Sequence, residues 1–305
     1  MRFAFIFVLL AMVAPASGIA WATDGPADGY VAEGVYRKTY GDLAIYAIAD
    51  RLGRLDFSIV KGLSAQEIAK LASPSPELDK TSLTSYVSFF LIKSPAGLFV
   101  VDAGLGQADM AKTLEKAGFS GEEATDVLLT HFHGDHVNGL LAGPNPVFPK
   151  ATVWASVVED QYWLKDGAGG RGQNAAEKLA PYIKAGRYKT FEPGQEIKPG
   201  VKAVELYGHT PGHVGFLFES GDLEFLAWGD VVHAYLLQFA RPDVTMTYDV
   251  DPQKAKETRA KVLGEAAERG YLVAGAHLPF PSLGQVKKGP AAGQGLSYVW
   301  DKELK

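Results

Sequence analysis

The sequence predicts an α/β protein in which short strands alternate with helices and present polar residues at the strand ends. Two observations predict this class. Short apolar segments, rich in β-branched and aromatic side chains, recur along the chain between segments with helical periodicity. Histidine and aspartate follow directly after several of these apolar segments, where a rigid scaffold would expose them to a cleft.

The strands are expected in chain order, beginning with two short ones and a hairpin. They are Leu43–Ile48, Phe57–Val60, the hairpin Tyr86–Ile92 with Leu98–Val101, Asp126–Thr130, Ala151–Ala155, Val201–Tyr207, Leu223–Trp228 and, as the last strand, Tyr271–Ala274. Helices are expected at Ala65–Leu71, Ala108–Ala117, around Tyr162 and Trp163, and from Asp251-Pro252 to about Arg269. The segment from Gly62 to Thr84 is expected to form either a pocket wall or lid, or a plain surface connection. The glycine-rich segment from Lys165 to Gln173 is expected to be a loop.

Residues 1–22 have the layout of a secretory signal peptide. Met1-Arg2 precedes an apolar segment from Phe3 to Val13, and the small-residue site Ala20-Trp21-Ala22 follows. The apolar segment is too short to span a bilayer comfortably, so cleavage is expected rather than membrane anchoring. We therefore expect residues 23–305 to form a single domain that is periplasmic or secreted, with no membrane attachment after cleavage.

Composition and charge exclude several classes of partner and framework. The chain has no cysteine, which leaves no disulfide framework, thiolate ligand or lipid-attachment site. The formal net charge is −5, and it becomes −6 when Arg2 leaves with the signal peptide. Nothing in this balance indicates nucleic acid or an anionic membrane as a partner. With 47% hydrophobic and 21% charged residues, the composition is that of an ordinary globular protein.

A dense histidine motif follows the apolar run Val127-Leu128-Leu129-Thr130. Its residues are His131-Phe132-His133-Gly134-Asp135-His136, and neutral imidazoles with a carboxylate are ligands that divalent cations bind. In an extended loop, side chains two residues apart point the same way, so His131 and His133 can share one ion. Asp135 and His136 then turn toward a second ion. The motif predicts a metal site rather than a chance cluster.

The remaining candidate ligands follow later strands. His209 comes after Val201–Tyr207 and is a third ligand for the first ion. His213 is expected to be a hydrogen-bonding support residue, because one ion needs only three protein ligands if it keeps an open position. Asp230 would alone be read as a turn or cap residue, but with two ions implied it is expected to bridge them. His277, at another strand end, can complete the set of the second ion.

Other candidate residues keep alternatives open. Asp102 closes a strand and is either a turn former or a partner that orients a ligating histidine. His233 either faces the substrate or is a structural histidine. Three aromatic residues are candidates for the substrate pocket, although buried aromatics are more often core residues: Phe132, Trp154 and Phe239.

Taken together, these motifs resemble the metallo-β-lactamase superfamily. The resemblance is carried, in chain order, by Asp102-Ala103-Gly104, the His131–His136 motif, Gly208-His209-Thr210-Pro211-Gly212-His213, Gly229-Asp230 and Gly275-Ala276-His277. It implies a four-layer αβ/βα sandwich, the metallo-β-lactamase fold, with the metals at one edge of the paired sheets. It also implies a first zinc on His131, His133 and His209, and a second on Asp135, His136 and His277. Asp230 and a hydroxide would bridge the two ions, and Asp102 would support a ligand.

Details within the motifs narrow the resemblance. True β-lactamases generally lack the bridging carboxylate, so Asp230 argues against that activity. Flavo-diiron oxidoreductases carry an acidic residue where this chain has His133. Three segments look most like the methyl parathion hydrolase group, which also contains lactonases and arylesterases: Gly229–His233, Gln238–Thr245 and Ala276–Pro281. Acyl-homoserine lactonases typically have a tyrosine where His233 stands, and this difference disfavours an acyl-homoserine lactone as the substrate.

The resemblance implies a dinuclear-metal hydrolase that opens lactones or aryl esters by attack of a metal-bridging hydroxide. Asp135 and Asp230 are the expected catalytic carboxylates, and Asp135 could shuttle a proton to the leaving alkoxide. Because a phosphotriester fits the same geometry, we expect secondary organophosphate hydrolysis, and a dedicated organophosphate hydrolase is an alternative. The two ions are expected to be zinc, with manganese, cobalt or iron also compatible with nitrogen and oxygen ligands.

Two rival functions use fewer of these residues. A mononuclear iron dioxygenase would bind its metal through His131, His209 and Asp230, leaving four good ligands idle. A non-catalytic zinc-binding protein is the other rival. The sequence is also compatible with a homodimer.

Overall fold

The computed structural model describes residues 25–106, 109–288 and 296–300. The expected signal peptide, residues 1–22, lies outside the described residues, so its cleavage stays a prediction. Within the described part, every helix is too short or too polar to span a membrane.

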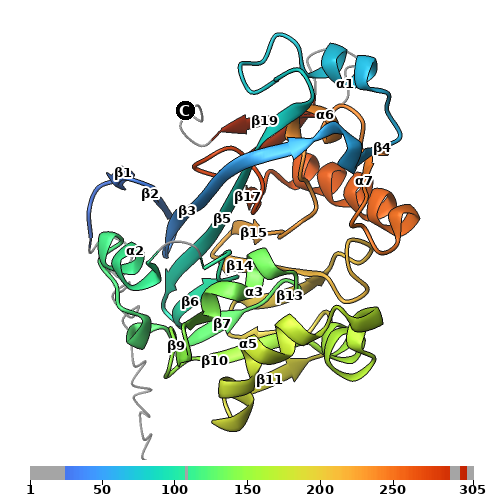
Figure 1. Ribbon diagram of the computed structural model, residues 1–305. Coiled ribbons are helices and arrows are strands. Elements are labelled where there is room, and N and C mark those ends of the chain that lie inside the picture. The colour runs from blue at the N-terminus through green and yellow to red at the C-terminus, as the bar shows by residue number, and fades with distance from the viewer. Residues whose placement is uncertain (1–24, 107–108, 289–295, 301–305) are drawn as a thin grey trace, which may run out of the picture.

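Two mixed β-sheets form the centre of the molecule (Figure 1). The first sheet has, in spatial order, β1 (Gly29–Ala32), β2 (Val35–Tyr40), β3 (Leu43–Asp56), β5 (Ser82–Ser94), β6 (Gly97–Val101), β7 (Asp126–Leu128), β10 (Thr152–Ser156) and β11 (Tyr188–Phe191). The second has β12 (Glu196–Lys198), β13 (Val201–Glu205), β14 (Val214–Ser220), β15 (Leu223–Ala227), β17 (Leu272–Ala274), β18 (Leu283–Lys288) and β19 (Leu296–Trp300). Two short pairs are β4 (Val60–Lys61) with β16 (Thr245–Met246), and β8 (Leu141–Ala142) with β9 (Asn145–Pro146).

Helices occupy the connections between strands. The α-helices of the described chain are α1 (Ala65–Ala72), α2 (Met110–Lys116), α3 (Gly134–Val137), α4 (Val157–Asp160), α5 (Gln173–Lys184), α6 (Tyr235–Gln238) and α7 (Pro252–Arg269). The predicted helices at α1, α2 and α7 are confirmed within one or two residues at each end. Ser64 and Glu67 form a capping box at the start of α1, which explains why that helix begins where it does.

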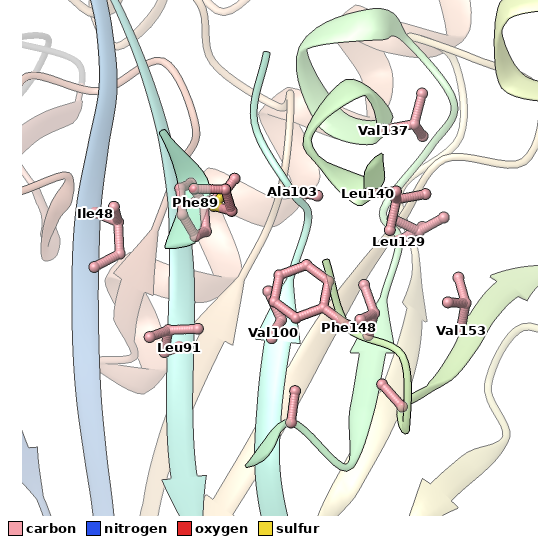
Figure 2. Close-up of a cluster of buried hydrophobic side chains, with 14 of the residues drawn as sticks. Ile48, Phe89, Leu91, Val100, Ala103, Leu129, Val137, Leu140, Phe148 and Val153 are labelled. Carbon is pink, nitrogen blue, oxygen red and sulfur yellow. The ribbon is translucent and has the colours of Figure 1, made fainter. Parts of the chain in front are cut away.

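Both faces of the first sheet are buried. Along β5, Phe89 and Leu91 enter the apolar cluster under α2 and α5, whereas Phe90 and Ile92 enter the cluster between the two sheets. Figure 2 shows the first of these clusters, with Phe89, Leu91 and Val100 among its labelled side chains. The strands therefore read as continuous apolar runs rather than as an alternating pattern.

The second sheet is covered on its outer face by α7. Leu226 and Val273 of the sheet share an apolar cluster with Val262 and Leu263 of that helix, and Figure 1 shows the helix lying along the sheet. The layers are thus helix, sheet, sheet and helix. This confirms the four-layer αβ/βα sandwich.

Two predictions about strands were wrong. The predicted strand Phe57–Val60 is mostly a 3-10 turn, Phe57–Ile59, which Asp56 caps by accepting a hydrogen bond of 2.8 Å from Ser58 N. The long strand β3 ends just before this turn, because it stays paired with β5 as far as Asp56. Tyr271–Ala274 is not the last strand, since β18 and β19 follow it. β18 carries several polar residues and lacks an apolar run, and β19 is a short segment at the edge of the second sheet.

The strands deliver their following loops to one edge of the sandwich. β6, β7 and β10 are parallel neighbours, and so are β15 and β17 in the other sheet. The carboxyl ends of parallel neighbours lie at the same edge, which brings the loops after β6, β7, β15 and β17 together. Those loops carry Asp102, the histidine motif, Asp230 and His277.

Candidate metal centre

Seven predicted ligands converge in two adjoining groups. The first group is His131, His133, His209 and Asp230, and the second is Asp135, His136, Asp230 and His277. Within each group, one candidate ligand atom from every residue lies within 4.8 Å of the others. Asp230 belongs to both groups, as a bridging carboxylate would.

The local backbone explains how one short motif serves two groups. His133 is the N-cap residue of α3 and has extended dihedral angles (φ −65°, ψ 155°). His131 and His133 therefore lie on an extended segment, with their side chains on the same side. Asp135 and His136 lie in the first turn of α3, which carries them toward the second group. The motif is thus divided as predicted, with His131 and His133 in one group and Asp135 and His136 in the other.

In the first group three ring nitrogens converge. His131 Nε2 lies 3.0 Å from His133 Nδ1, which lies 2.9 Å from His209 Nε2. Asp230 Oδ2 lies 3.2 Å from His209 Nε2 and 3.6 Å from His131 Nε2. Nitrogen atoms this close present their lone pairs to a common point, as the ligands of a single cation do.

The second group is arranged around the other side of Asp230. His136 Nε2 lies 3.1 Å from Asp230 Oδ1, and His277 Nε2 lies 3.2 Å from Asp230 Oδ2. Asp135 Oδ2 completes the group at 3.4 Å from His277 Nε2. Each oxygen of Asp230 therefore faces at least one ring of this group.

Hydrogen bonds on the far side of the rings select their tautomers. Asp102 Oδ2 accepts from His136 Nδ1 at 2.8 Å, and Asp249 Oδ1 accepts from His209 Nδ1 at 2.9 Å. The carbonyl of Tyr86 accepts from His277 Nδ1 at 2.6 Å. A ring that donates through Nδ1 keeps the lone pair of Nε2 for a ligand. When neutral, these three histidines are thus held in the tautomer that binds metal.

The residues present fit divalent ions. Among the described residues, His136 Nε2 and Asp230 Oδ1 are buried atoms that face each other at 3.1 Å and have no hydrogen-bond partner. Leaving buried polar atoms unsatisfied costs about 1–3 kcal/mol each, and a cation between them would remove that cost. Nitrogen and oxygen donors in this combination suit zinc, manganese, cobalt or iron.

The pKa shifts keep two central ligands in their metal-binding forms. Burial, reinforced by the neighbouring His136, holds the pKa of His131 well below its usual range, so this ring is neutral. Burial opposes ionisation of Asp230, but the surrounding histidines, His136 and His277 first, hold its pKa well below the usual range. A neutral imidazole and an ionised carboxylate are the states that coordinate metal.

Two predicted support residues contact the ligands from behind. Asp102 is buried with a left-handed backbone (φ 60°), and it accepts hydrogen bonds from Thr130 N at 2.8 Å and from His136. His213 is outside both groups. Its Nδ1 donates to the carbonyl of Leu206 at 2.8 Å, and its Nε2 accepts from Asp230 N at 3.0 Å. It therefore holds the backbone of the shared aspartate.

Only glycine fits at position 229, directly before that aspartate. Its φ is +56°, and an added Cβ would lie 2.6 Å from His213 Nε2 and 2.8 Å from Thr130 Oγ1. The close approach lets His213 reach the backbone of Asp230. The Gly229-Asp230 pair is thus a structural requirement of the site.

A cavity of about 520 Å³ adjoins both groups. The two groups supply His133, Asp135, His209, Asp230 and His277 to its wall. Other lining residues come from β3 and β5, and Figure 1 shows these strands extending toward α1. No residue from Gly62 to Thr84 lines the cavity, so among the described residues this segment is a connection that packs behind the wall.

The structure places the four predicted pocket residues differently. His233 lines the cavity, and its Nε2 lies 3.0 Å from Asp230 Oδ2. Phe132, Trp154 and Phe239 do not line it and pack in three separate apolar clusters. Phe132 lies between two candidate ligands on an extended segment, so its side chain points away from them into the core. Trp154 donates to Asp126 Oδ1 at 2.7 Å instead of facing a substrate.

Three residues at the site were missed by sequence reasoning: Tyr248, Asp249 and Glu159. Tyr248 lines the cavity, with its ring 5.0 Å from that of His233. Asp249, which bonds His209, stands close before α7 and looks like a turn residue in the sequence. Glu159 is a buried carboxylate on α4. The one available signal was the charge of Glu159 beside apolar residues.

The sequence matches the metallo-beta-lactamase superfamily over residues 84–277, which is more than half of the chain and includes all seven candidate ligands. The chain therefore belongs to the metallo-beta-lactamase superfamily.

Individual relatives share parts of the chain. An N-acyl homoserine lactonase of Bacillus sp is 28% identical over 108 residues, which is 35% of this chain and 38% of the lactonase. The chain thus aligns with well under half of that relative. Among solved structures, hydrolase AbOPH of the beta lactamase superfamily is 28% identical with a TM-score of 0.82, covering 88% of this chain and 97% of its own. The dizinc quorum-quenching lactonase AidC, 23% identical with a TM-score of 0.78, shares the fold over 89% of this chain and 99% of its own.

Proposed function

We propose that this protein is a metal-dependent hydrolase that opens lactones or aryl esters with two divalent ions, zinc in preference to manganese, cobalt or iron. The observation that carries the proposal is the position of Asp230, shared by two ligand groups that face one cavity. The similarity to lactonases and to hydrolase AbOPH supports it.

The two groups would each hold one ion, the first through His131, His133 and His209 and the second through Asp135, His136 and His277. Asp230 would be the ligand common to both. Bound there, two divalent ions supply Lewis acidity that polarises a substrate carbonyl and makes a water molecule acidic enough to act as the nucleophile near neutral pH.

Asp135 is the residue placed to move a proton. It is partly buried and lines the cavity. Burial alone would raise its pKa, but His136 and His277 hold the pKa below its usual range. The ionised carboxylate can therefore accept a proton from the attacking water and pass it to the leaving alkoxide.

The cavity wall fits a substrate with an apolar portion. Four side chains supply this surface: Leu55, Ile59, Val87 and Leu105. Tyr248 and His233 form the polar side near Asp230. Burial raises the pKa of Tyr248 well above its usual range, which keeps its hydroxyl protonated and available to donate to a substrate oxygen. A small lactone or aryl ester matches this division.

A phosphotriester offers the same features, an attacked centre that builds charge on oxygen and apolar substituents. We therefore propose organophosphate hydrolysis as a secondary activity. The mononuclear dioxygenase is disfavoured, because His133, Asp135, His136 and His277 all lie in the same cluster and would then have no role.

The test combines metal content with activity. Protein purified without added metal is subjected to elemental analysis and then assayed on an aryl lactone, an acyl-homoserine lactone and an aryl phosphotriester. We expect about two ions of zinc or a similar divalent metal per chain, together with turnover of a lactone. The relative rates rank the substrates. A single iron per chain without hydrolysis would overturn the proposal. Lack of phosphotriester turnover by metal-loaded protein would remove only the secondary activity.

We also propose that residues 1–22 direct export and are removed. Fractionation of expressing cells, with N-terminal sequencing of the exported protein, should find it outside the cytoplasm with a start after Ala22. A chain that stays in the cytoplasm with an intact N-terminus would contradict this.

A further inference from the structure

Glu159 is a buried carboxylate that the proposed chemistry does not use. It lies on α4, and its side chain is 1% exposed. Its neighbours are the two loops that carry the histidines of the first ligand group. A charged group in such a position must be compensated by hydrogen bonds, because burial without them costs several kcal/mol.

Each oxygen of Glu159 accepts two hydrogen bonds. Oε1 accepts from Phe132 N at 3.0 Å and from Trp163 Nε1 at 2.6 Å. Oε2 accepts from Thr210 Oγ1 at 2.8 Å and from Gly212 N at 3.0 Å. Three of these donors are N–H groups that cannot accept in return, so Glu159 must act as the acceptor in at least three of the four hydrogen bonds.

Three of the four donors belong to the two loops of the first group. Phe132 stands between His131 and His133, and Thr210 follows His209 directly. One carboxylate therefore joins segments that lie 76 residues apart at His133 and His209. The two sets of hydrogen bonds set the distance between the loops.

Two further contacts tighten the same arrangement. Trp163, which donates to Glu159, packs edge-on against the ring of His133 with centroids 5.3 Å apart. It sits in the π-helical turn Gln161–Lys165 that follows α4. On the other side, an added Cβ at Gly212 would lie 2.2 Å from Glu159 N, so the His209 loop touches the backbone of α4.

The second group is supported by other residues. His136 bonds Asp102, and His277 bonds the carbonyl of Tyr86. Within the described part of the chain, Glu159 bonds neither Asp102 nor Tyr86; its four hydrogen bonds go to other residues. Apart from Trp163, the donors to Glu159 thus all lie on the two loops of the first group.

We propose that Glu159 is a positioning residue for the first metal site, holding the His131–His133 loop against the His209 loop and so setting the affinity of that site and not of the second. This inference rests on the proposed binding of two ions. Residues that orient ligands from behind typically change metal affinity by about 10- to 100-fold when they are replaced.

The substitution Glu159→Gln keeps the size of the side chain but leaves it one oxygen. If that oxygen faces Phe132 N and Trp163 Nε1, the amide nitrogen faces Thr210 and Gly212, and Gly212 N loses its acceptor. The other orientation leaves two N–H donors without one. In either orientation, at least one backbone N–H of a loop that carries candidate ligands loses its hydrogen-bond acceptor.

The experiment separates the two sites by ligand deletion. Zinc is titrated against a competing chelator in H277A, where the tighter constant reports the first group, and in H133A, where the second group stays complete. E159Q is then added to each background. Adding E159Q to H277A should weaken zinc binding about 10- to 100-fold. Adding E159Q to H133A should weaken it by less than twofold. Equal effects in both pairs, or none in the first, would overturn the inference.

A matched control and a milder variant protect the test. Asp126 is also 1% exposed and accepts a bond from a tryptophan Nε1, but it lies at the opposite end of β7 from the histidine motif. D126N should lower stability and leave zinc binding unchanged. If E159Q does not fold, T210V removes a single donor to Glu159 and should weaken the first site alone by several-fold; an unchanged first site would overturn the inference. A wild-type chain that binds no pair of zinc ions would overturn the proposed function as well.

Discussion

Asp102 Oδ2 accepts a hydrogen bond of 2.8 Å from His136 Nδ1, joining the end of β6 to the first turn of α3. The same carboxylate accepts from Thr130 N at 2.8 Å, so it holds both ends of the histidine motif. Its backbone is left-handed (φ 60°), a conformation that costs about 1–3 kcal/mol in a residue other than glycine and persists where the surroundings impose it.

Replacement of Asp102 should weaken the second metal site. In D102N the amide cannot supply a negative charge to the ring of His136, so zinc affinity at the second group should fall about 10- to 100-fold. Zinc titration of the H133A background, with and without D102N, measures this. The control is D251N at the N-cap of α7, which contacts no candidate ligand side chain and should leave affinity unchanged. Undiminished zinc binding by D102N would contradict the orienting role.

Substitutions of Asp230 and Asp135 should differ in the number of metal ions whose binding they weaken. D230N removes the carboxylate common to both groups and should reduce zinc content below two per chain, with loss of affinity at each site. D135N removes a residue of the second group alone and should leave the first ion bound. Native mass spectrometry at a series of free zinc concentrations distinguishes these patterns. Identical patterns for the two variants would refute the shared role of Asp230.

Position 229 should tolerate no side chain. G229A meets both a left-handed backbone and two close atoms, His213 Nε2 and Thr130 Oγ1. G221A is the matched control, because its φ is +59° and its Cβ would meet nothing within 4 Å. Backbone strain should lower the free energy of unfolding of each variant by about 1–2 kcal/mol. The clash should lower that of G229A by about 1–3 kcal/mol more. Urea unfolding of metal-free protein measures both, and equal losses would show that the clash relaxes freely.

Buried tyrosine should make the protein sensitive to alkali. Burial raises the pKa of Tyr182 to about 12, and its hydroxyl donates to the carbonyl of Leu140 at 3.0 Å. Because the folded-state pKa lies above the unfolded value of about 10, the folded protein holds this proton more tightly. The resulting stability is complete below pH 10 and is lost as the pH rises from 10 toward 12.

The variant Y182F should therefore be less stable at neutral pH, by about 1–2 kcal/mol, but should lose less stability than the wild type between pH 9 and pH 12. Urea midpoints measured across this range give both values. Parallel curves for the two proteins would show that Tyr182 does not ionise on unfolding there.

Much of the candidate site followed from local patterns in the sequence. The spacing of His131, His133, Asp135 and His136 determined their division between two groups, because side-chain direction alternates along an extended segment and then rotates in a helical turn. The apolar runs before Asp230 and His277 identified strand ends. The same alternation also directs the side chain of Phe132 into the core. The prediction that Phe132 lines the pocket did not take this alternation into account.

The partners of these ligands were decided only by the tertiary structure. Asp249 reaches His209 from 40 residues away, and Glu159 reaches Gly212 from 53 residues away. A hydrogen bond forms only when the donor–acceptor distance is right to within about a few tenths of an ångström. A sequence pattern specifies only the face or strand end on which a residue lies. The sequence by itself therefore determined which side chains could bind metal, and the packing of α4, α7 and the loops between strands decided which carboxylates hold them in place.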